Sequence, residues 1–481
     1  MGIMRTDSFL YDARLIQPYH LIQPHRLLGT ENSQENQMTK KPEQKTTNNT
    51  SRRSFIKNSS LFVAGGAVAG QLAFSRSAHA FGSDEIRIGL IGCGGRGTGA
   101  ASQAMNTDGP TRLVAMGDAF SDRLQQSLRG LKGQHSDKVN VPQERQFVGF
   151  DAYKHVLESD IDLVILATPP GFRPQHVEAA INANKHVFME KPVAVDAPGV
   201  RRVLAATAEA KKKNLALAVG LQRRHERRYM ETIKRLQDGA IGDIILTRAY
   251  WNGGGVWVRP RREGQTEMEY QMRNWYYFNW LCGDHITEQH IHNLDVINWL
   301  MKGYPKTAQG QGGRQVRTGK DNGQIFDHHI VEFTYGDDSK CFSQCRHIRD
   351  TWSSVSEHAH GTKGSVNIGG ATIYDPSGNA TWSYGRGGGG GHQQEHHDLF
   401  ASLRKGERPN EGEYGALSSM TSILGRMATY SGQSINWDDA LKSERVIAPV
   451  DELTSYDDTP PVVPDENMNY PIPMPGTTKT V

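Results

Sequence analysis

The sequence predicts an α/β protein with two folded domains, the first built on a doubly wound parallel sheet. Strand-like and helix-like segments alternate strictly over residues 86–220, which is the pattern of such a sheet. A glycine-rich turn joins the first of these strands to the first helix. The chain has 481 residues, more than one domain of ordinary size, and its 37% of apolar residues can supply a large core.

The first 80 residues have the features of an export signal. Arg52 and Arg53, with Phe55 two positions on, precede an uncharged stretch over residues 58–75, and Ala78-His79-Ala80 follows as a cleavage pattern. The paired arginines are typical of the twin-arginine route. The uncharged stretch is too short and glycine-rich to span a membrane. We expect twin-arginine machinery to export a periplasmic or otherwise exported protein without stable membrane insertion; a start at Met38 would give a more ordinary leader.

The charge distribution excludes one class of partner. Residues 1–80 carry ten basic and five acidic residues, which leaves 45 basic and 47 acidic residues in the remainder. The folded part is therefore not basic, and we expect no nucleic acid partner. The four cysteines are too few for a disulfide framework in a chain of this length.

The first strand and helix frame a dinucleotide-binding turn. A buried strand over residues 86–91 runs into Gly92-Cys93-Gly94-Gly95-Arg96-Gly97, and residues 98–105 read as a helix. The glycines permit a tight turn and close backbone approach, and the N-terminus of the helix faces a pyrophosphate. The pattern predicts a nucleotide site at this turn.

The second strand indicates which dinucleotide binds. It covers residues 113–116 and ends near Asp118, where a carboxylate can accept hydrogen bonds from both ribose hydroxyls. A carboxylate repels a 2′-phosphate, so the sequence favours NAD over NADP. Arg123 lies near enough to weaken that preference.

The alternation continues to residue 220. We expect strands over 162–169, 186–190 and 215–220, with helices over 175–183 and 198–212. Thr168-Pro169 and Glu190-Lys191-Pro192 stand at the carboxyl ends of two of these strands, where ligands bind in doubly wound sheets.

Strand-like segments also occur in the second half of the chain. They cover residues 243–250, 330–335 and 339–345, and Gly336-Asp337-Asp338 between the last two predicts a hairpin.

These features together resemble the Gfo/Idh/MocA family, named for glucose-fructose oxidoreductase, inositol dehydrogenase and a rhizopine-catabolism protein. The resemblance spans residues 86 to about 445 and rests most on Glu190-Lys191-Pro192, with Ala167-Thr168-Pro169, His176 and a C-terminal pattern from Gly425 to Asp438. It implies an NAD-binding Rossmann domain followed by an α/β domain with a large, mostly antiparallel open sheet. The expected parts are a leader (1–80), the NAD-binding domain (81–220), the substrate-binding domain (221–459) and a C-terminal arm (460–481).

The resemblance also implies a cofactor site and an oligomer. The residues expected to hold NAD are Gly92, Gly94, Gly95, Arg96, Gly97, Asp118, Thr168, Pro169, His176, Glu190 and Lys191. A homo-oligomer, a dimer or tetramer, is expected from the resemblance alone.

One segment carries candidate catalytic side chains. Residues 283–300 read as a helix, and at helical spacing four residues form a polar stripe opposite the apolar side: His285, Glu288, His292 and Asp295. A solvated face normally holds Lys, Glu and Gln rather than two imidazoles between carboxylates.

The resemblance suggests roles for this stripe. Family members commonly carry Asp-x-Gly-x-His-x-x-Asp at this helix, so His292 and Asp295 match, while Glu288 stands in place of Asp and His290 in place of Gly. We expect oxidation of a secondary alcohol with His292 as general base and Lys191 stabilising the oxyanion. Glu288 would orient His292 or hold a substrate hydroxyl.

Besides this catalytic role, the polar stripe and its neighbours could bind a metal or a carbohydrate. His285, Glu288 and His292 could supply three metal ligands, although no recognised zinc motif has their spacing, and we expect no metal. A carbohydrate is expected to bind through Trp275 and Tyr276, which precede the stripe, and through His285 and Asp295 of the stripe itself.

The sequence therefore predicts an exported oxidoreductase that passes hydride from a secondary hydroxyl of a sugar, polyol or glycoside to NAD. Because free NAD is scarce outside the cytoplasm, we expect the NAD to be tightly bound. The first alternative is a glycoside hydrolase that works by oxidation, elimination and reduction with resident NAD. The second is a non-catalytic sugar- or nucleotide-binding protein.

Overall fold

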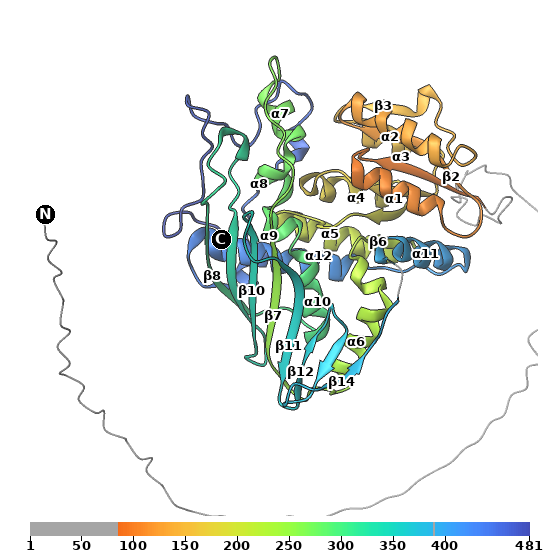
Figure 1. The fold of residues 1–481 in the computed structure, drawn as a ribbon. Helices are drawn as coiled ribbons and strands as arrows, with labels where there is room; N and C mark the ends of the chain where they lie inside the picture. Colours follow the sequence, from red (N-terminus) through yellow and green to blue (C-terminus); the bar gives the residue numbers. More distant parts are fainter. Residues whose placement is uncertain (1–84, 388–389) are drawn as a thin grey trace, which may run out of the picture. The chain divides into compact units, whose positions relative to one another are not determined.

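The computed structural model of the protein describes residues 85–387 and 390–481 (Figure 1). The leader expected in residues 1–80 lies outside the described residues. Within the described part, no helix combines the length and apolar character needed to cross a membrane.

The first sheet has six parallel strands in the order β3-β2-β1-β4-β5-β6. In chain order its elements are β1 (Ile86–Ile91), α1 (Gly95–Met105), β2 (Thr111–Asp118), α2 (Ser121–Gln134), β3 (Gln146–Val148), α3 (Ala152–Glu158), β4 (Leu163–Leu166), α4 (Arg173–Asn182), β5 (His186–Met189), α5 (Ala197–Lys212) and β6 (Leu217–Val219). The predicted doubly wound parallel sheet is confirmed.

Helices cover both faces of this sheet, and the central strands are therefore apolar throughout. In β4, Leu163 and Ile165 pack with the α1 and α2 side, while Val164 and Leu166 pack with α3, α4 and α5. A strand buried on both faces reads as a continuous apolar run, which is why this strand was visible in the sequence.

The second sheet has nine strands in the order β14-β13-β12-β11-β7-β10-β9-β8-β15, antiparallel except for the pair β7 and β10. Its strands are β7 (Ile244–Gly253), β8 (Thr307–Gly313), β9 (His328–Thr334), β10 (Lys340–His347), β11 (Ser354–Gly361), β12 (Gly364–Asn367), β13 (Thr372–Tyr374), β14 (Ala380–Ser383) and β15 (Ile435–Asn436). The expected hairpin between β9 and β10 forms. The predicted mostly antiparallel second sheet is confirmed.

The remaining α-helices of the described residues are α6 (Arg227–Gln237), α7 (Glu267–Arg273), α8 (Asn279–Cys282), α9 (His285–Glu288), α10 (Ile291–Met301), α11 (Gly391–Arg404), α12 (Gly412–Ser431) and α13 (Trp437–Lys442). Helices α10 and α12 pack against the second sheet (Figure 1). Ile330, Phe342 and Val355 on the sheet remain exposed. The homo-oligomer stays a prediction.

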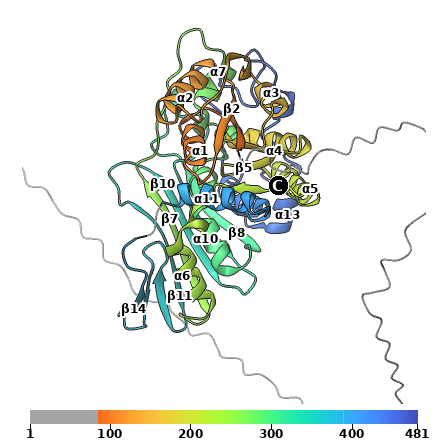
Figure 2. The same ribbon diagram turned by 90° about the vertical axis from the view of Figure 1, so that its right-hand side faces the viewer.

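The chain returns to the nucleotide domain after β14, before it adds the last strand, β15, to the second sheet. Helix α11 packs beside α1 (Figure 2), and its Leu399 and Phe400 share a core with Phe188 of β5. Helix α12 packs against α5. The expected boundary at residue 220 therefore does not separate the packing of the two domains, because α11 and α12 follow this boundary in the sequence but pack against the nucleotide domain.

The C-terminal segment, residues 443–481, runs over both halves of its own chain. Asp196 of the nucleotide domain accepts hydrogen bonds from the backbone amides of Ile447 and Ala448. Farther on, the Val462 carbonyl accepts a hydrogen bond from Gln271 of α7. The segment therefore ties the nucleotide domain to the second domain, and it begins earlier than the arm expected at residue 460.

The turn between β1 and α1 requires glycine at two positions. Gly92 has φ of +94°, a conformation that side chains strongly disfavour. A Cβ on Gly97 would lie 1.9 Å from the Gly92 carbonyl oxygen. Gly94 and Gly95 instead face open space, with no atom within 4 Å of a Cβ. The turn is thus closely packed on one side and open on the other.

We expect Gly97→Ala to damage this turn, because its new methyl group can only be accommodated by moving backbone. The loss is expected to be about 1–3 kcal/mol of stability, with loss of nucleotide binding. Thermal unfolding and a nucleotide titration measure both effects. Gly99→Ala is the matched control, since its Cβ would meet nothing closer than Arg96 at 3.8 Å. Equal behaviour of the two variants would contradict the packing argument.

Candidate active site

A cavity of about 350 Å³ lies over the glycine turn and at the carboxyl ends of the nucleotide strands. Eight of the residues predicted to bind NAD line it: Gly92, Gly94, Gly95, Arg96, Asp118, Thr168, Pro169 and His176. Gly97 shapes the turn, while Glu190 and Lys191 lie outside the lining. The structure therefore gathers most of the predicted cofactor residues around one space.

Asp118 is fixed at one end of this cavity by backbone amides. Its Oδ2 accepts a hydrogen bond from the Cys93 amide at 2.6 Å, and its Oδ1 accepts one from the Phe120 amide at 2.8 Å. Burial raises the pKa of Asp118, while these two hydrogen bonds oppose that effect. The carboxylate thereby links the glycine turn to the end of β2, as a ribose-binding carboxylate does.

Four of the predicted cofactor residues form two pairs. Thr168 Oγ1 lies 3.2 Å from His176 Nδ1. The Arg96 Nε lies 2.6 Å from Glu190 Oε1, so the arginine of the glycine turn is paired with the first residue of the Glu-Lys-Pro motif. These contacts place Lys191 directly after a residue that is attached to the cavity wall.

The second domain supplies the other side of the cavity, with Trp257, Arg259, Met272, Arg273 and Trp275. Tyr456 of the C-terminal segment contacts two residues of the cavity lining: its hydroxyl donates a hydrogen bond to the Ala119 carbonyl, and its ring stacks on Phe120 at 5.4 Å. Tyr456 could not be predicted from the sequence, because no local pattern indicates a contact between residues so far apart in the chain.

Lys191 makes the central polar contact between the two domains. Its Nζ donates hydrogen bonds to the Glu288 carbonyl oxygen at 2.7 Å and to Glu288 Oε1 at 2.9 Å. Both side chains are 13% exposed, so the ion pair is largely shielded from water. The structure brings two of the three predicted catalytic residues into direct contact.

His292 lies nearby as a neutral imidazole. Burial, and then the charges of Lys191 and Arg223, lower the pKa of His292 well below its ordinary 6.5. Its ring stacks on Trp251 at 5.9 Å, and its Nδ1 is buried without a hydrogen-bond partner among the described residues. Nε2 is therefore the nitrogen available for proton transfer.

The prediction of a single helix over residues 283–300 is wrong. The structure has two helices, α9 (His285–Glu288) and α10 (Ile291–Met301), separated by Gln289 and His290. His290 is fully buried, and its Nε2 lies 2.7 Å from the Ser343 hydroxyl of β10. The break divides the expected polar stripe between two helices. His285 and Glu288 lie on α9, and His292 and Asp295 lie on α10.

Two members of that stripe form contacts with residues other than Lys191. His285 is fully buried against Asp284. Asp295 accepts hydrogen bonds from the Arg224 guanidinium at 2.8 to 3.1 Å and from the Ser418 hydroxyl at 2.8 Å. In this structure the polar groups of His285 and Asp295 are thus engaged with other protein groups, and their predicted role in substrate binding stays a prediction.

The two predicted aromatic residues lie on one turn but differ in access. Trp275 lines the cofactor cavity. Tyr276 is 2% exposed, and its hydroxyl is buried without a hydrogen-bond partner in the described part of the chain. Its ring lies 6.1 Å from that of His347. Tyr276 therefore forms a wall behind the site in this conformation.

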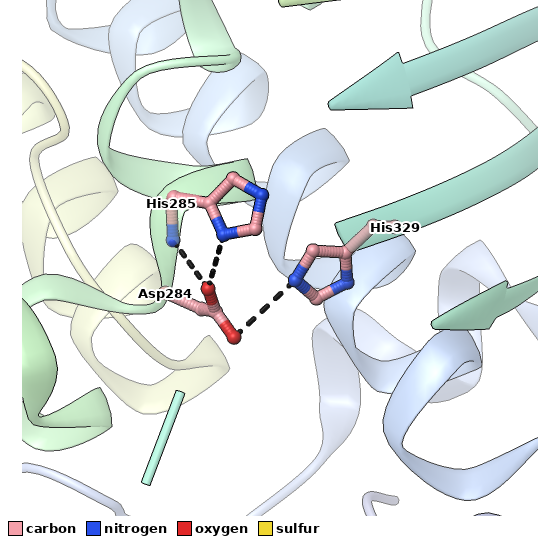
Figure 3. A group of neighbouring side chains, drawn as sticks. All are labelled: Asp284, His285 and His329. Atoms are coloured by element: carbon pink, nitrogen blue, oxygen red, sulfur yellow. Dashed lines mark hydrogen bonds and ion pairs between the residues drawn. The ribbon is translucent and has the colours of Figure 1, made fainter. Parts of the chain in front are cut away.

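Asp284, His285 and His329, which we call the Asp284 cluster, have ligand atoms within 4.8 Å of one another (Figure 3). This set differs from the metal ligands considered in the sequence, since it contains neither Glu288 nor His292. Asp284 already accepts hydrogen bonds from the Tyr430 hydroxyl at 2.6 Å and the Phe326 amide at 2.9 Å. Arg317 and Arg426 lie close by and oppose a further cation. The cluster is therefore described best as a hydrogen-bond network.

Two family models match the chain. Residues 86–221 match the oxidoreductase family with an NAD-binding Rossmann fold, and residues 229–367 match the GFO/IDH/MocA C-terminal domain. Together they cover more than half of the sequence. The chain belongs to the Gfo/Idh/MocA family of oxidoreductases, and its first domain is the NAD-binding domain of that family.

The curated relatives include inositol dehydrogenases. Inositol 2-dehydrogenase of Rhizobium meliloti is 25% identical over 282 residues, which are 58% of this chain and 74% of that enzyme. Inositol 2-dehydrogenase of Salmonella paratyphi B is 26% identical over 48% of this chain and 59% of that enzyme, less than two thirds of its length. The family and these relatives indicate a dehydrogenase that acts on CH–OH groups.

A solved structure has the same fold. Scyllo-inositol dehydrogenase from Lactobacillus casei, with bound NAD(H) and scyllo-inositol, superposes with a TM-score of 0.56 at 20% identity. The match covers 74% of this chain and 99% of that one. At this identity the likeness establishes the shared fold.

Buried histidines predict how stability depends on pH. Burial lowers the pKa of six of them below the ordinary 6.5: His176, His285, His290, His292, His347 and His396. Each binds a proton more readily when unfolded, so its contribution is complete above pH 6.5 and is lost as the pH falls below that value. His225 and Glu395 act in the opposite direction, since their pKa values are raised.

We expect the larger set to decide the sign. Lowering the pH from 7.5 to 5.5 should cost roughly 1 kcal/mol for each of the six histidines, reduced by the two opposing groups. Urea unfolding at the two pH values measures the difference. An equal or higher unfolding midpoint at pH 5.5 would show that these histidines are not buried as neutral imidazoles.

Proposed function

We propose that the protein oxidises a secondary hydroxyl of a sugar, polyol or glycoside, with NAD as the hydride acceptor. The observation that carries this proposal is the shielded ion pair of Lys191 and Glu288 beside neutral His292. The pair stands next to Glu190, which is attached to the wall of the cofactor cavity. An ammonium group and an unprotonated imidazole together suit removal of a hydroxyl proton.

The residues around the cavity fit NAD. Gly94 and Gly95 leave open space before α1, as close approach of a pyrophosphate requires. Asp118 is held in place to accept ribose hydroxyls, and its charge disfavours a 2′-phosphate, although Arg123 also lines the cavity. When bound, NAD supplies the hydride acceptor.

Each polar residue of the site has a distinct role in the proposed reaction. His292 accepts the hydroxyl proton at Nε2, because its lowered pKa keeps it neutral at working pH. Lys191 stabilises the negative charge that develops on the substrate oxygen. Glu288 holds the ammonium group through its carboxylate and its backbone carbonyl. Glu288 therefore positions Lys191 rather than His292.

One observation favours the glycoside hydrolase as a second candidate. The C-terminal segment lies against the end of the cofactor cavity, where Tyr456 stacks on Phe120 and Arg273 lies 3.9 Å over the same ring. A segment packed against the end of the cavity favours retention of a bound NAD that is reduced and reoxidised within one turnover. Incubation with aryl glycosides without added NAD distinguishes the candidates. Released aglycone supports hydrolysis, whereas oxidised product that forms only with an added acceptor supports dehydrogenation.

Substitution of the two groups that handle the proton tests the main proposal. Lys191→Met and His292→Asn are each expected to lower turnover by at least about a hundredfold, because each removes a group that acts on the reacting hydroxyl. Reduction of NAD across a sugar and polyol panel measures turnover, and a fluorescence titration checks that nucleotide still binds. Lys306→Met is the matched control, since Lys306 pairs with exposed Asp338 at the surface. Near-normal turnover in both site variants would refute the assignment.

A further inference from the structure

Gln289 stands at the break between α9 and α10, between Glu288 and His292 of the proposed site. Its backbone amide donates a hydrogen bond to the His285 carbonyl at 3.0 Å, and its own carbonyl accepts one from the His292 amide at 3.3 Å. The backbone of Gln289 is thus fixed on both sides. Gln289 is partly exposed, as is Glu288, whereas Thr287 and His290 on either side of them are buried.

The side-chain amide of Gln289 is held by one buried contact. His347 Nε2 lies 2.8 Å from Gln289 Oε1. The amide nitrogen, Nε2, has no partner among the described residues and is not one of their buried polar atoms. It therefore remains free to donate.

The orientation of the Gln289 side-chain amide follows from the charge of Arg317 and the single proton of the neutral His347 imidazole. The Arg317 Nη2 lies 2.6 Å from His347 Nδ1, and a guanidinium can only donate hydrogen bonds. His347 Nδ1 must therefore accept, which leaves the single imidazole proton on Nε2. That proton is donated to Gln289, so the atom that faces His347 must be oxygen. The amide NH₂ group is consequently directed away from His347.

The support behind Gln289 is rigid. His347 is 5% exposed and Arg317 is 4% exposed, and Arg317 also donates a hydrogen bond to the Phe326 carbonyl. The His347 ring lies 4.4 Å from that of His285 and 6.1 Å from that of Tyr276. Burial, then the neighbouring His285 and Arg317, lower the pKa of His347 far below 6.5. The imidazole therefore stays neutral, and its hydrogen bonding does not reverse near neutral pH.

We propose that Gln289 is a fixed hydrogen-bond donor that selects a substrate oxygen beside the reacting carbon. The inference rests on the proposed function, which places the reacting hydroxyl between Lys191 and His292. The substrate class that fits this arrangement is a cyclic compound with oxygens on adjacent carbons. One oxygen belongs to the reacting hydroxyl, and its neighbour accepts a hydrogen bond from Gln289. A substrate that offers only a donor at this place leaves the amide without a partner, which costs affinity.

The test compares myo-inositol with its single-deoxy analogues. Binding is measured by calorimetry on protein loaded with NADH, so that no turnover occurs. The wild-type protein is expected to bind one deoxy analogue roughly tenfold more weakly than myo-inositol. Gln289→Ala is expected to bind that analogue and myo-inositol with equal affinity. Persistence of the same discrimination in Gln289→Ala would overturn the proposal.

Two further variants separate a specific donor from a merely structural side chain. Gln289→Glu can still accept from His347 but replaces the donor with an acceptor, so a mono-O-methyl inositol whose ether oxygen can only accept at this place is expected to bind to it at least as weakly as to Gln289→Ala. Gln309→Glu is the matched control, because it adds the same charge at an exposed position of β8 and should leave affinity unchanged. Equal effects of Gln289→Glu and Gln309→Glu would also overturn the proposal.

The outcome for Gln289 is distinguishable from that for the proposed function. If the wild-type protein reduces NAD with a sugar but binds no cyclic polyol through Gln289, the inference about the amide falls while the oxidoreductase assignment stands. If the NAD-loaded protein oxidises no sugar or polyol, the proposed function itself falls.

Discussion

The proposed active site depends on the ion pair between Lys191 and Glu288. Lys191 follows the end of β5 in the nucleotide domain, and Glu288 ends α9 in the second domain, so this contact joins the two halves of the site. Desolvation of such a pair is costly, and loss of either partner leaves the other charge buried and unpaired. The second hydrogen bond, to the Glu288 carbonyl, fixes the lysine even where the carboxylate can rotate.

The position of Glu288 depends in turn on Asp284. Asp284 has φ of +68°, a backbone conformation that glycine normally adopts. The strain is maintained by hydrogen bonds to its carboxylate from Tyr430 of α12 and from the Phe326 amide before β9. Its carbonyl accepts hydrogen bonds from the amides of Thr287 and Glu288, so the same residue begins α9. The short helix is thereby anchored to both the second sheet and α12, which suits a site that must hold its geometry.

Much of the fold could be predicted because its signals are local. The strands of the first sheet are apolar runs, the glycine turn has a specific spacing, and Glu190-Lys191-Pro192 stands at a strand end. The break after Glu288 could not be predicted, because it depends on burial of His290 against Ser343 of a distant strand. Helical spacing correctly placed Asp295 one turn after His292 on α10, but it could not show that the Asp295 carboxylate is paired with the Arg224 guanidinium. Tyr456 and His347 were missed for the same reason, since each acts through contacts that are remote in sequence.

The most direct test of the account is a single-turnover experiment with NAD-saturated protein and a panel of inositols, aldoses and glycosides. Absorbance of the reduced nicotinamide at about 340 nm is recorded after mixing. If the protein transfers hydride as proposed, absorbance rises to nearly one reduced nicotinamide per active site with at least one member of the panel, and deuterium at the oxidised carbon slows the rise severalfold. No rise with any member, from protein shown to bind NAD, would contradict it.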